Sequence, residues 1–340
     1  MLMIVHPEGL SEQILYAVDQ HMMRGGEALV FLDPNADSMV SRSQEGNLIP
    51  AGMSSELPSL LEAWGISFDN TKVLTDNQLA LRVMMGQGQR PVPHLGMLGV
   101  QGDFLTQGDI ITNRLETVNF SSPGAISHLN GSTTIFEPLV VSSTDAMLMD
   151  RSFVESVTDP SLLFDEFESQ DRSFVIGARL TGVVQSAFPN GKPEIIEEPN
   201  DSSVPDVGEE ALSESSDSEE VEASIEHISG SASPVTIVAF ADTDFLSDRL
   251  WVQVSQFFGQ RIPQPFANNG DIVINAMDNL SGGADLSSMR SRGRYSRPFS
   301  LVLDLQREAD DRLREEESVL LSRVTETEAS LAELNLDGDG

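Results

Sequence analysis

The first 32 residues contain the pattern that most constrains the fold. Two short apolar runs, Leu2–Val5 and Ala28–Leu32, predict buried strands. Between them, Ser11 is a suitable N-cap for a helix that runs through Met23, and Gly25-Gly26 ends that helix. A strand–helix–strand unit of about 30 residues has the length that a right-handed parallel crossover requires. We therefore expect an α/β fold with an open, mostly parallel sheet flanked by helices.

A late strand is expected to return to the same sheet. The β-branched run Val235–Phe240 is followed by the acidic turn Ala241-Asp242-Thr243-Asp244. An amphipathic helix is predicted over 245–258, with Gly259 as its stop, and a second helix over Ile272–Leu280. The order of strand, acidic turn and helices is typical of an open α/β sheet.

The middle of the chain contains shorter candidates, and we interpret 110–192 as a β-rich extension. Residues 86–99 are rich in Gly, Pro and Gln and give little periodic signal. The candidates are a helix over Leu57–Trp64 stopped by Gly65, strands at Lys72–Leu74, Ala80–Met84, Ile110–Thr112, Glu116–Asn119, Thr133–Phe136 and Leu139–Val141, a short helix over Ser161–Phe167, and a strand or hairpin over Ser173–Phe188.

The domain organisation follows from two segments of different composition. Residues 194–233 are acidic, without Lys, Arg or aromatic residues, so we predict a disordered insert that acts as a solvated linker. A phosphorylated or calcium-buffering tail is the functional alternative. Residues 1–193 and 234–300 would then form one discontinuous α/β domain. Residues 301–336 have heptad-compatible apolar spacing with polar interruptions, which predicts a long amphipathic helix.

Charge and composition exclude several classes of protein. The net charge of −34 includes thirteen negative charges between Glu194 and Glu226, and the remainder still carries −21. Such a surface repels phosphate backbones, so we expect no nucleic acid partner. The chain has no cysteine, which excludes disulfides, thiolate metal sites and cysteine nucleophiles. No apolar run approaches the roughly 18 residues of a membrane-spanning helix.

The usual catalytic and cofactor motifs are missing from the sequence. It has no G-x-S-x-G elbow, no G-x-G-x-x-G opening a helix and no G-x-x-x-x-G-K, and its histidines lack helical metal spacing. We therefore expect no enzyme activity, no cofactor and no resident metal ion.

The polar residues at strand ends are nevertheless candidates for binding, because open α/β sheets place ligands at the carboxyl edge. These candidates are His6, Asp33, Asp242 and Asp244, and the further candidates Asn268 and Asn269 precede a predicted helix. Clustered carboxylates there could hold Mg²⁺ or Ca²⁺, which would suit a hydrolase or a metal-dependent enzyme. The alternative, which we favour, is that they form turns and helix caps. His6 would then be a hydrogen-bonded turn residue before Pro7.

The other candidate is the Arg-rich loop Arg290, Arg292, Arg294 and Arg297, a concentration of positive charge on an acidic chain. It could receive a carboxylate, a phosphate or an acidic partner, or it could pair with the chain's own acids. Both interpretations stay open.

Several segments together resemble a known family. They are 241–254, 266–271 with 279–282, 290–294, Val5-His6-Pro7 with Gly25-Gly26 and Asp33-Pro34, and 61–65. These residues are similar to GldG-like auxiliary components of ABC transport systems, which are associated with gliding motility in some bacteria. The resemblance covers nearly the whole chain outside the acidic insert.

The resemblance implies a class I glutamine-amidotransferase-like or flavodoxin-like fold. Amidotransferase activity depends on a cysteine nucleophile that this chain lacks, so the resemblance implies a non-enzymatic binding domain. It also implies ABC membrane and ATPase subunits as partners, and an extracytoplasmic domain anchored by flanking transmembrane helices. We accordingly expect this chain to be part of a longer, membrane-anchored protein.

Overall fold

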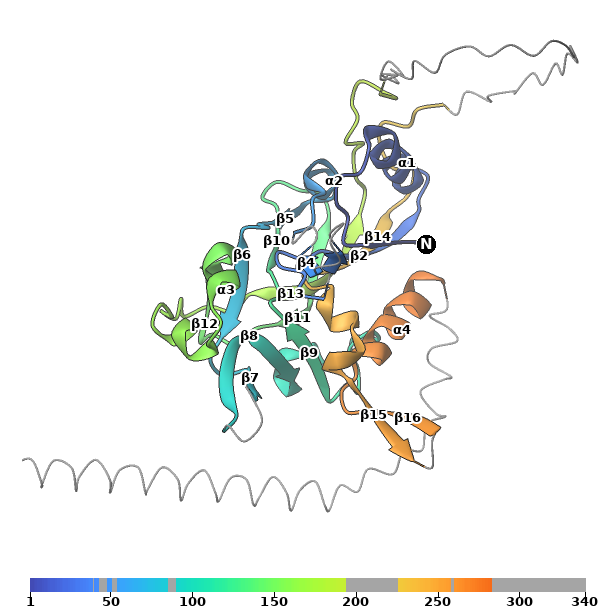
Figure 1. Cartoon of the computed structure of the whole chain (residues 1–340). Coiled ribbons are helices and arrows are strands. Elements are labelled where there is room, and N and C mark those ends of the chain that lie inside the picture. The colour runs from blue at the N-terminus through green and yellow to red at the C-terminus, as the bar shows by residue number, and fades with distance from the viewer. Residues whose placement is uncertain are drawn as a thin grey trace, which may run out of the picture. The chain divides into compact units, whose positions relative to one another are not determined.

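The computed structural model describes residues 1–38, 40–42, 48–50, 54–84, 90–193, 226–257 and 260–282 (Figure 1). These residues belong to one compact unit that spans 1–287. In the described part of the chain, none of the helices combines the length and the apolar character that crossing a bilayer demands.

A seven-stranded mixed sheet forms the centre of the molecule. Its order is β1-β2-β14-β13-β10-β5, and β11 also pairs with β13. The strands are β1 (Leu2–Val5), β2 (Glu27–Phe31), β14 (Val235–Phe240), β13 (Val175–Gly182), β10 (Ile126–His128), β5 (Ile66–Phe68) and β11 (Ile135–Val141).

The expectation of a mostly parallel sheet is wrong. Only β1–β2 and β2–β14 are parallel, whereas the four described pairings beyond β14 are antiparallel. A parallel pair needs a crossover such as the helix between β1 and β2, and the middle strands are not separated by crossover helices of that kind. The fold is therefore mixed α/β, with its parallel part confined to three strands.

The strand–helix–strand unit at the start of the chain is confirmed. Helix α1 (Glu12–Met23) begins after Ser11, whose Oγ accepts a hydrogen bond from the Ile14 N–H at 3.4 Å. Strand β1 pairs in parallel with β2, Met3 opposite Leu29. The return of Val235–Phe240 to this sheet is also confirmed, as β14 pairs in parallel with β2.

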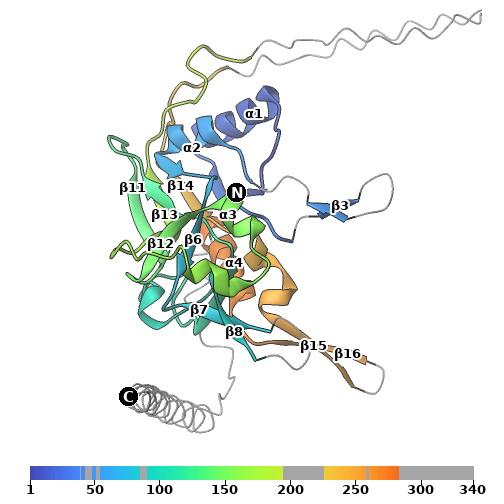
Figure 2. The ribbon, with the colours of Figure 1, turned by 60° about the vertical axis from the view of Figure 1, so that its left-hand side comes forward.

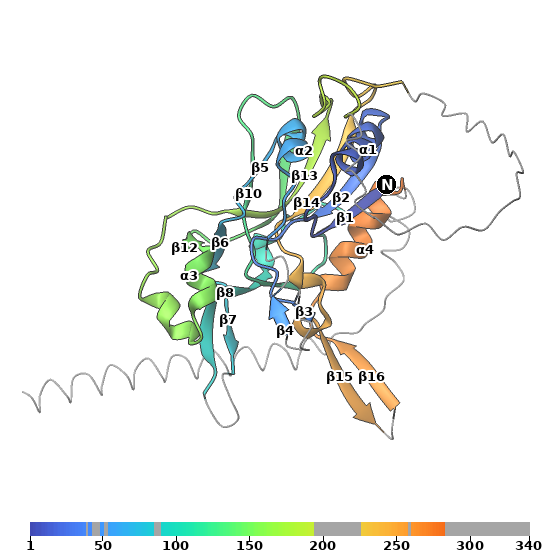
Figure 3. The ribbon, with the colours of Figure 1, turned by 45° about the horizontal axis from the view of Figure 1, so that its top comes forward.

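Helices cover both faces of the sheet, and the alternation of side chains along β2 assigns a face to each (Figure 3). Ala28 and Val30 face α1 and α2 (Pro58–Trp64). Leu29 and Phe31 face α4 (Asn269–Leu280), which lies on the other side. Because both faces are covered, β2 is buried along most of its length.

A set of smaller β structures surrounds the α4 side of the sheet (Figure 1). They are the sheet β7–β8–β9 (Ala80–Val83, Val92–Gln101, Thr117–Ser121), the pair β6–β12 (Lys72–Asp76, Ala146–Asp150), the hairpin β3–β4 (Val40–Arg42, Leu48–Pro50) and the ribbon β15–β16 (Val252–Phe257, Gln260–Pro265). The short helix α3 (Arg151–Ser156) follows β12. The 3₁₀ helices are η1 (Gly102–Phe104), η2 (Pro160–Phe164), η3 (Asp244–Leu246) and η4 (Asp248–Leu250). Figure 2 shows that the β15–β16 ribbon projects away from the core.

The helix predicted over 245–258 is wrong. The chain forms η3 and η4 and then the strand β15. From Val252 to Ser255 apolar and polar residues alternate, which favours a strand, and the antiparallel partner β16 decides the competition. The predicted helix over Ile272–Leu280 is confirmed as part of α4.

Two further differences lie in the middle of the chain. Strand β8 lies mostly in the Gly- and Pro-rich stretch 86–99, which gave little periodic signal. The strand predicted at Ile110–Thr112 is instead a turn, because the Asp109 carboxylate accepts the Ile111 N–H at 2.8 Å and the Asp109 carbonyl accepts the Asn113 N–H at 2.7 Å. Aspartate at the start of this segment thus offers the backbone an alternative to strand pairing.

The predicted acidic insert overlaps the described residues only at its end. There the Gln20 side chain of α1 donates to the Ile228 carbonyl and accepts from the Ile228 N–H, at 3.0 and 2.9 Å. The Ser231 Oγ accepts the Val184 N–H at 3.0 Å. The chain is therefore ordered before Ser233, on the surface of α1. Residues 194–225 and the helix predicted over 301–336 lie outside the described residues.

Candidate functional site

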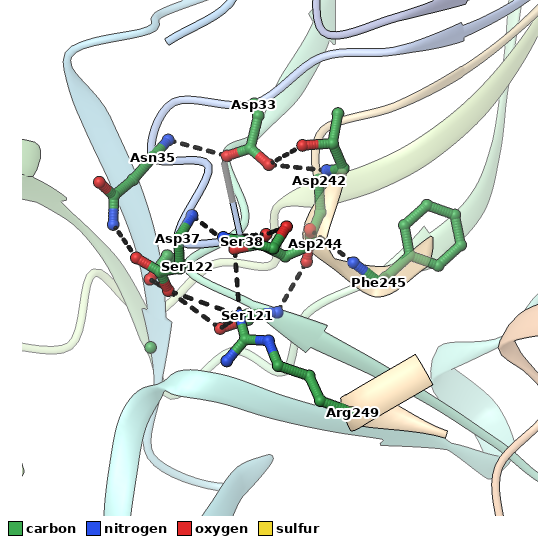
Figure 4. Close-up of polar contacts among 12 residues, drawn as sticks. Asp33, Asn35, Asp37, Ser38, Ser121, Ser122, Asp242, Asp244, Phe245 and Arg249 are labelled. Carbon is green, nitrogen blue, oxygen red and sulfur yellow. Dashed lines mark hydrogen bonds and ion pairs between the residues drawn. The ribbon is translucent and has the colours of Figure 1, made fainter. Parts of the chain in front are cut away.

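Three of the predicted site residues meet at the carboxyl edge of the parallel strands. Asp33 follows β2, and Asp242 and Asp244 follow β14. Phe31 pairs with Phe240, so the residues two positions beyond each, Asp33 and Asp242, arrive at the same place. All three carboxylates are fully buried, and one oxygen from each lies within 4.8 Å of the others (Figure 4).

The Asp33 carboxylate holds the two strand ends together. Its Oδ2 accepts the Thr243 N–H at 2.7 Å and the Thr243 hydroxyl at 2.5 Å. Its Oδ1 accepts the Asn35 N–H at 2.8 Å, which closes the turn after β2. Asp33 therefore acts as a turn residue for its own loop and as an anchor for the loop after β14.

The Asp242 carboxylate connects β14 to two neighbouring elements. Its Oδ2 accepts the Ser121 N–H at the end of β9, at 2.7 Å. Its Oδ1 accepts the Phe245 N–H in η3, at 3.0 Å. Both carboxylate oxygens thus satisfy main-chain donors that would otherwise be buried without partners.

The Asp244 carboxylate binds the loop after β2 from the opposite direction. Its Oδ2 accepts the Asp37 N–H at 2.7 Å, and its Oδ1 accepts the Ser38 N–H at 2.8 Å and the Ser38 hydroxyl. Arg249 Nη2 lies 3.3 Å from Oδ2. In the described part of the chain, Arg249 is the cation that contacts this cluster.

Asp37 is a fourth carboxylate at the site, and the sequence reasoning missed it. Its Oδ2 accepts the hydroxyls of Ser121 and Ser122 at 3.1 and 3.2 Å, and its Oδ1 accepts Asn35 Nδ2 at 2.8 Å. Arg249 Nη2 lies 4.0 Å from Oδ2. The sequence does show an acid four residues after Asp33 in a turn-rich segment. That spacing alone does not show whether the loop folds so that the Asp37 side chain reaches the other carboxylates.

Burial and mutual repulsion favour the protonated forms of these acids. Burial, with a further contribution from Asp244, raises the pKa of Asp33 to about 7 despite the Thr243 hydrogen bonds. Burial raises the pKa of Asp242 well above its ordinary value, and the charges of Asp33 and Asp244 raise it further. Burial and Asp244 also raise the pKa of Asp37. The cluster therefore retains protons close to neutral pH.

The three carboxylates can play two chemical roles: they accept hydrogen bonds that hold the loops together, and their oxygens are of the type that binds a divalent cation. Asp33, Asp242 and Asp244 have the ligand type and proximity that Mg²⁺ or Ca²⁺ requires. However, both oxygens of each already accept hydrogen bonds, most of them from the main chain. A cation would have to compete with these donors for the same lone pairs.

His6 is linked to the cluster through Ser55. It occupies a positive-φ position (48°) at the end of β1, and its N–H donates to the Phe31 carbonyl at 3.0 Å. Its Nδ1 lies 3.1 Å from Ser55 Oγ, and this same Oγ accepts the Asp33 N–H. His6 is thus connected to the main chain of Asp33 through Ser55.

The two asparagines at the start of α4 join it to β9 instead of capping it with their side chains. Asn268 is at the N-cap position, but its Oδ1 accepts the N–H groups of Glu116 and Thr117 at 2.9 and 3.2 Å. The Asn269 amide accepts the Asn119 N–H and donates to the carbonyls of Asn119 and Phe245. Asn268 thus occupies the predicted N-cap position, but the prediction of side-chain caps is wrong, because most of the partners lie in other segments. Asn268 Nδ2 also donates within α4, to the Asp271 carboxylate at 2.9 Å.

Arg290, Arg292, Arg294 and Arg297 lie outside the described residues, so both interpretations of the Arg-rich loop stay predictions.

The similarity to known proteins extends well beyond this cluster. A family model described as "ABC-type uncharacterized transport system" matches residues 1–276. The curated proteins gave no match.

Proposed function

Since the chain belongs to this family of auxiliary components of ABC-type transport systems, we propose that it is a non-enzymatic binding domain of such a system. The observation that carries the proposal is the state of the carboxylates at the sheet edge. Asp33, Asp242 and Asp244 are fully buried and bound to the chain's own donors. A catalytic group must reach its substrate, and these groups are used to assemble the loops instead.

We further propose a gliding-motility-type system, an extracytoplasmic location and a link to the membrane. The support is the resemblance of 241–254 and 266–271 to GldG-like components. The same resemblance supports an amidotransferase-like or flavodoxin-like ancestry for the sheet, with the discontinuous domain 1–193 and 234–300. Its three parallel strands are compatible with that ancestry.

The partners in this proposal are the membrane and ATPase subunits of the transporter. The test is affinity purification of the tagged, membrane-extracted protein from its own host, followed by mass spectrometry. We expect both subunits to co-purify in fixed ratio. Recovery of the folded protein without either subunit would contradict the proposal, and protease accessibility in intact spheroplasts would test the side of the membrane.

A metal-dependent enzyme, such as a hydrolase, is the second candidate function. The observation in its favour is the approach of three carboxylate oxygens to within 4.8 Å of one another. It requires that a divalent cation displaces donors such as the Ser121 N–H, which is 2.7 Å from Asp242. A cation titration followed by thermal melting separates the two candidates, as set out in the Discussion.

A further inference from the structure

Among the described strands, the outer side of β1 is an unpaired edge of the central sheet. β1 stands at the end of the strand order, and β2 is its partner among the described strands. The His6 N–H donates inward to the Phe31 carbonyl, so by alternation along the strand the main-chain groups of Ile4 also face β2. The N–H and C=O groups of Met3 and Val5 therefore point away from the sheet.

This edge lacks the usual protection against pairing. Proteins block edges with charged side chains, prolines or bulges. Residues Leu2–Val5 include no charge and no proline, and their register with β2 is continuous. By contrast, β5 at the opposite end of the sheet has only three residues, and its Ile66 is buried in the core cluster of α2.

An apolar surface continues from this edge onto α4. Met1, Met3 and Val5 are 44 %, 40 % and 41 % exposed, and Met3 and Val5 lie opposite Leu29 and Phe31, on the α4 face of the sheet. These three side chains together with Ile274 and Met277 are called the β1 patch below.

The contact between Met1 and α4 shows that the two parts of the patch adjoin. Ser281 Oγ lies 3.9 Å from Met1 Sδ, so this side of α4 faces β1. Met277 and Ile274 lie one and two turns before Ser281 on the same side of the helix, and both are exposed. Figures 1 and 3 both show the start of the chain beside α4.

The charge around the patch selects among possible occupants. Glu8, Glu12 and Glu27 lie in the first 31 residues, where Arg24 is the only arginine and there is no lysine, and α4 adds Asp271 and Asp278. A second copy of a chain with net charge −34 would bring the same acids to the same edge, which costs free energy. A segment with basic residues beside its apolar ones fits better.

We propose that the β1 patch binds an extended segment of a partner protein, which adds a strand to the sheet next to β1. Its alternate side chains would be apolar and cover Met3, Val5 and Met277, and Lys or Arg residues would flank them. This inference rests on the edge geometry and charge, and it does not depend on the transport role.

The test uses a fluorescent peptide with a Val-Thr-Val-Thr-Val centre and two lysines at each end, titrated with the protein and followed by anisotropy. We expect saturable binding, weakened about tenfold or more (about 1.4 kcal/mol) by Met3→Pro. The substitution removes an outward N–H and leaves the β1–β2 hydrogen bonds in place. Val5→Lys is a second variant that places a charge on the patch and does not rely on proline. Leu162→Lys on η2, where Leu162 is 47 % exposed, is the matched control and should bind like the parent.

Four results would overturn the inference. One is that the parent protein does not bind the peptide. Another is equal binding of the peptide by the parent and by folded Met3→Pro and Val5→Lys. A third is equal binding of a peptide with the same lysines and a scrambled centre, since charge alone would then explain the signal. The last is a concentration-dependent dimer that Met3→Pro abolishes, which would assign the edge to a second copy.

Discussion

Asp33 and Thr243 are joined by two hydrogen bonds that end on the same carboxylate oxygen, one from the Thr243 N–H at 2.7 Å and one from its hydroxyl at 2.5 Å. The two residues are 210 positions apart in the sequence and follow neighbouring parallel strands. Asp244 lies in the same loop as Thr243, and its carboxylate accepts hydrogen bonds from the N–H groups of Asp37 and Ser38 in the loop after β2. The loops after β2 and β14 thus fix each other, and the acids between them explain the predictions below.

The first prediction concerns pH. The folded-state pKa of Asp33 is raised, to about 7, so the folded state binds more protons than the unfolded state between about pH 4 and pH 7. Stability should therefore fall as pH rises through this window, by at most about 1.4 kcal/mol per pH unit for each proton. Chemical denaturation at several pH values measures the slope.

The control for this prediction is Asp33→Asn. The amide cannot ionise but places an NH₂ group against one of the donors that Asp33 accepts. We expect the variant to be less stable than the parent at pH 5, with a smaller difference at pH 8. A pH slope identical to that of the parent would show that Asp33 is not the titrating group.

The second prediction concerns Arg249. Its Nη2 lies 3.3 Å from the fully buried Asp244 carboxylate, so Arg249→Gln leaves that charge without its cation. We expect a loss of about 1–3 kcal/mol at pH 8 and a smaller loss at pH 5, where protonation of the cluster relieves the repulsion. Arg82→Gln, an exposed arginine on β7 away from the cluster, is the control and should change stability by less than about 0.5 kcal/mol.

The third prediction concerns the junction of α4 with β9. Asn269 is 1 % exposed, and its amide binds Asn119 and Phe245 main-chain groups. Asn269→Ala would leave these groups buried without partners, and we expect a loss of about 2–4 kcal/mol. Asn279→Ala, at a half-buried position of the same helix, should cost less than about 1 kcal/mol. Similar midpoints in urea for the two variants would contradict this assignment.

The fourth prediction compares two glycines with nearly the same φ angle. Gly65 ends α2 at φ +83°, and a Cβ there would lie 2.0 Å from Ser132 Oγ. Gly131 has φ +86° with open space around it. Gly131→Ala should cost about 1 kcal/mol from backbone strain alone, and Gly65→Ala should cost clearly more. Equal thermal shifts would mean that Ser132 moves away freely.

The fifth prediction decides between the binding domain and the metal-dependent enzyme. A cation that binds the folded state alone stabilises it by RT ln(1 + L/Kd), where L is the free cation concentration, so the melting temperature keeps rising with the logarithm of the cation concentration above Kd. If the acids serve only as hydrogen-bond acceptors, 5 mM Mg²⁺ or Ca²⁺ should shift the parent no more than Asp242→Asn and no more than matched ionic strength does. A rise in the parent that grows with the logarithm of the cation concentration and that the variant loses would favour the metal-dependent enzyme.

Several helices and strands of the fold were predictable from the sequence. The strands Leu2–Val5 and Val235–Phe240, the helices around 12–23 and 272–280, and the stop at Gly65 each depend on local periodicity, capping or backbone conformation. The approach of Asp33 to Asp242 and Asp244 followed as soon as β2 and β14 were taken as parallel neighbours.

What only the tertiary structure decided depends on contacts between distant segments. Whether Trp251–Phe257 forms a helix or a strand was set by pairing with β16, and the antiparallel strands beyond β14 follow from the order in which loops bring them together. Partners up to about 200 residues away likewise bury the acids and bring Asp37 into the cluster. Distant partners also make Asn268 and Asn269 connect α4 to β9. Local pattern determines an element because its hydrogen bonds and side-chain face lie within a few residues, whereas pairing and burial are properties of the assembled core.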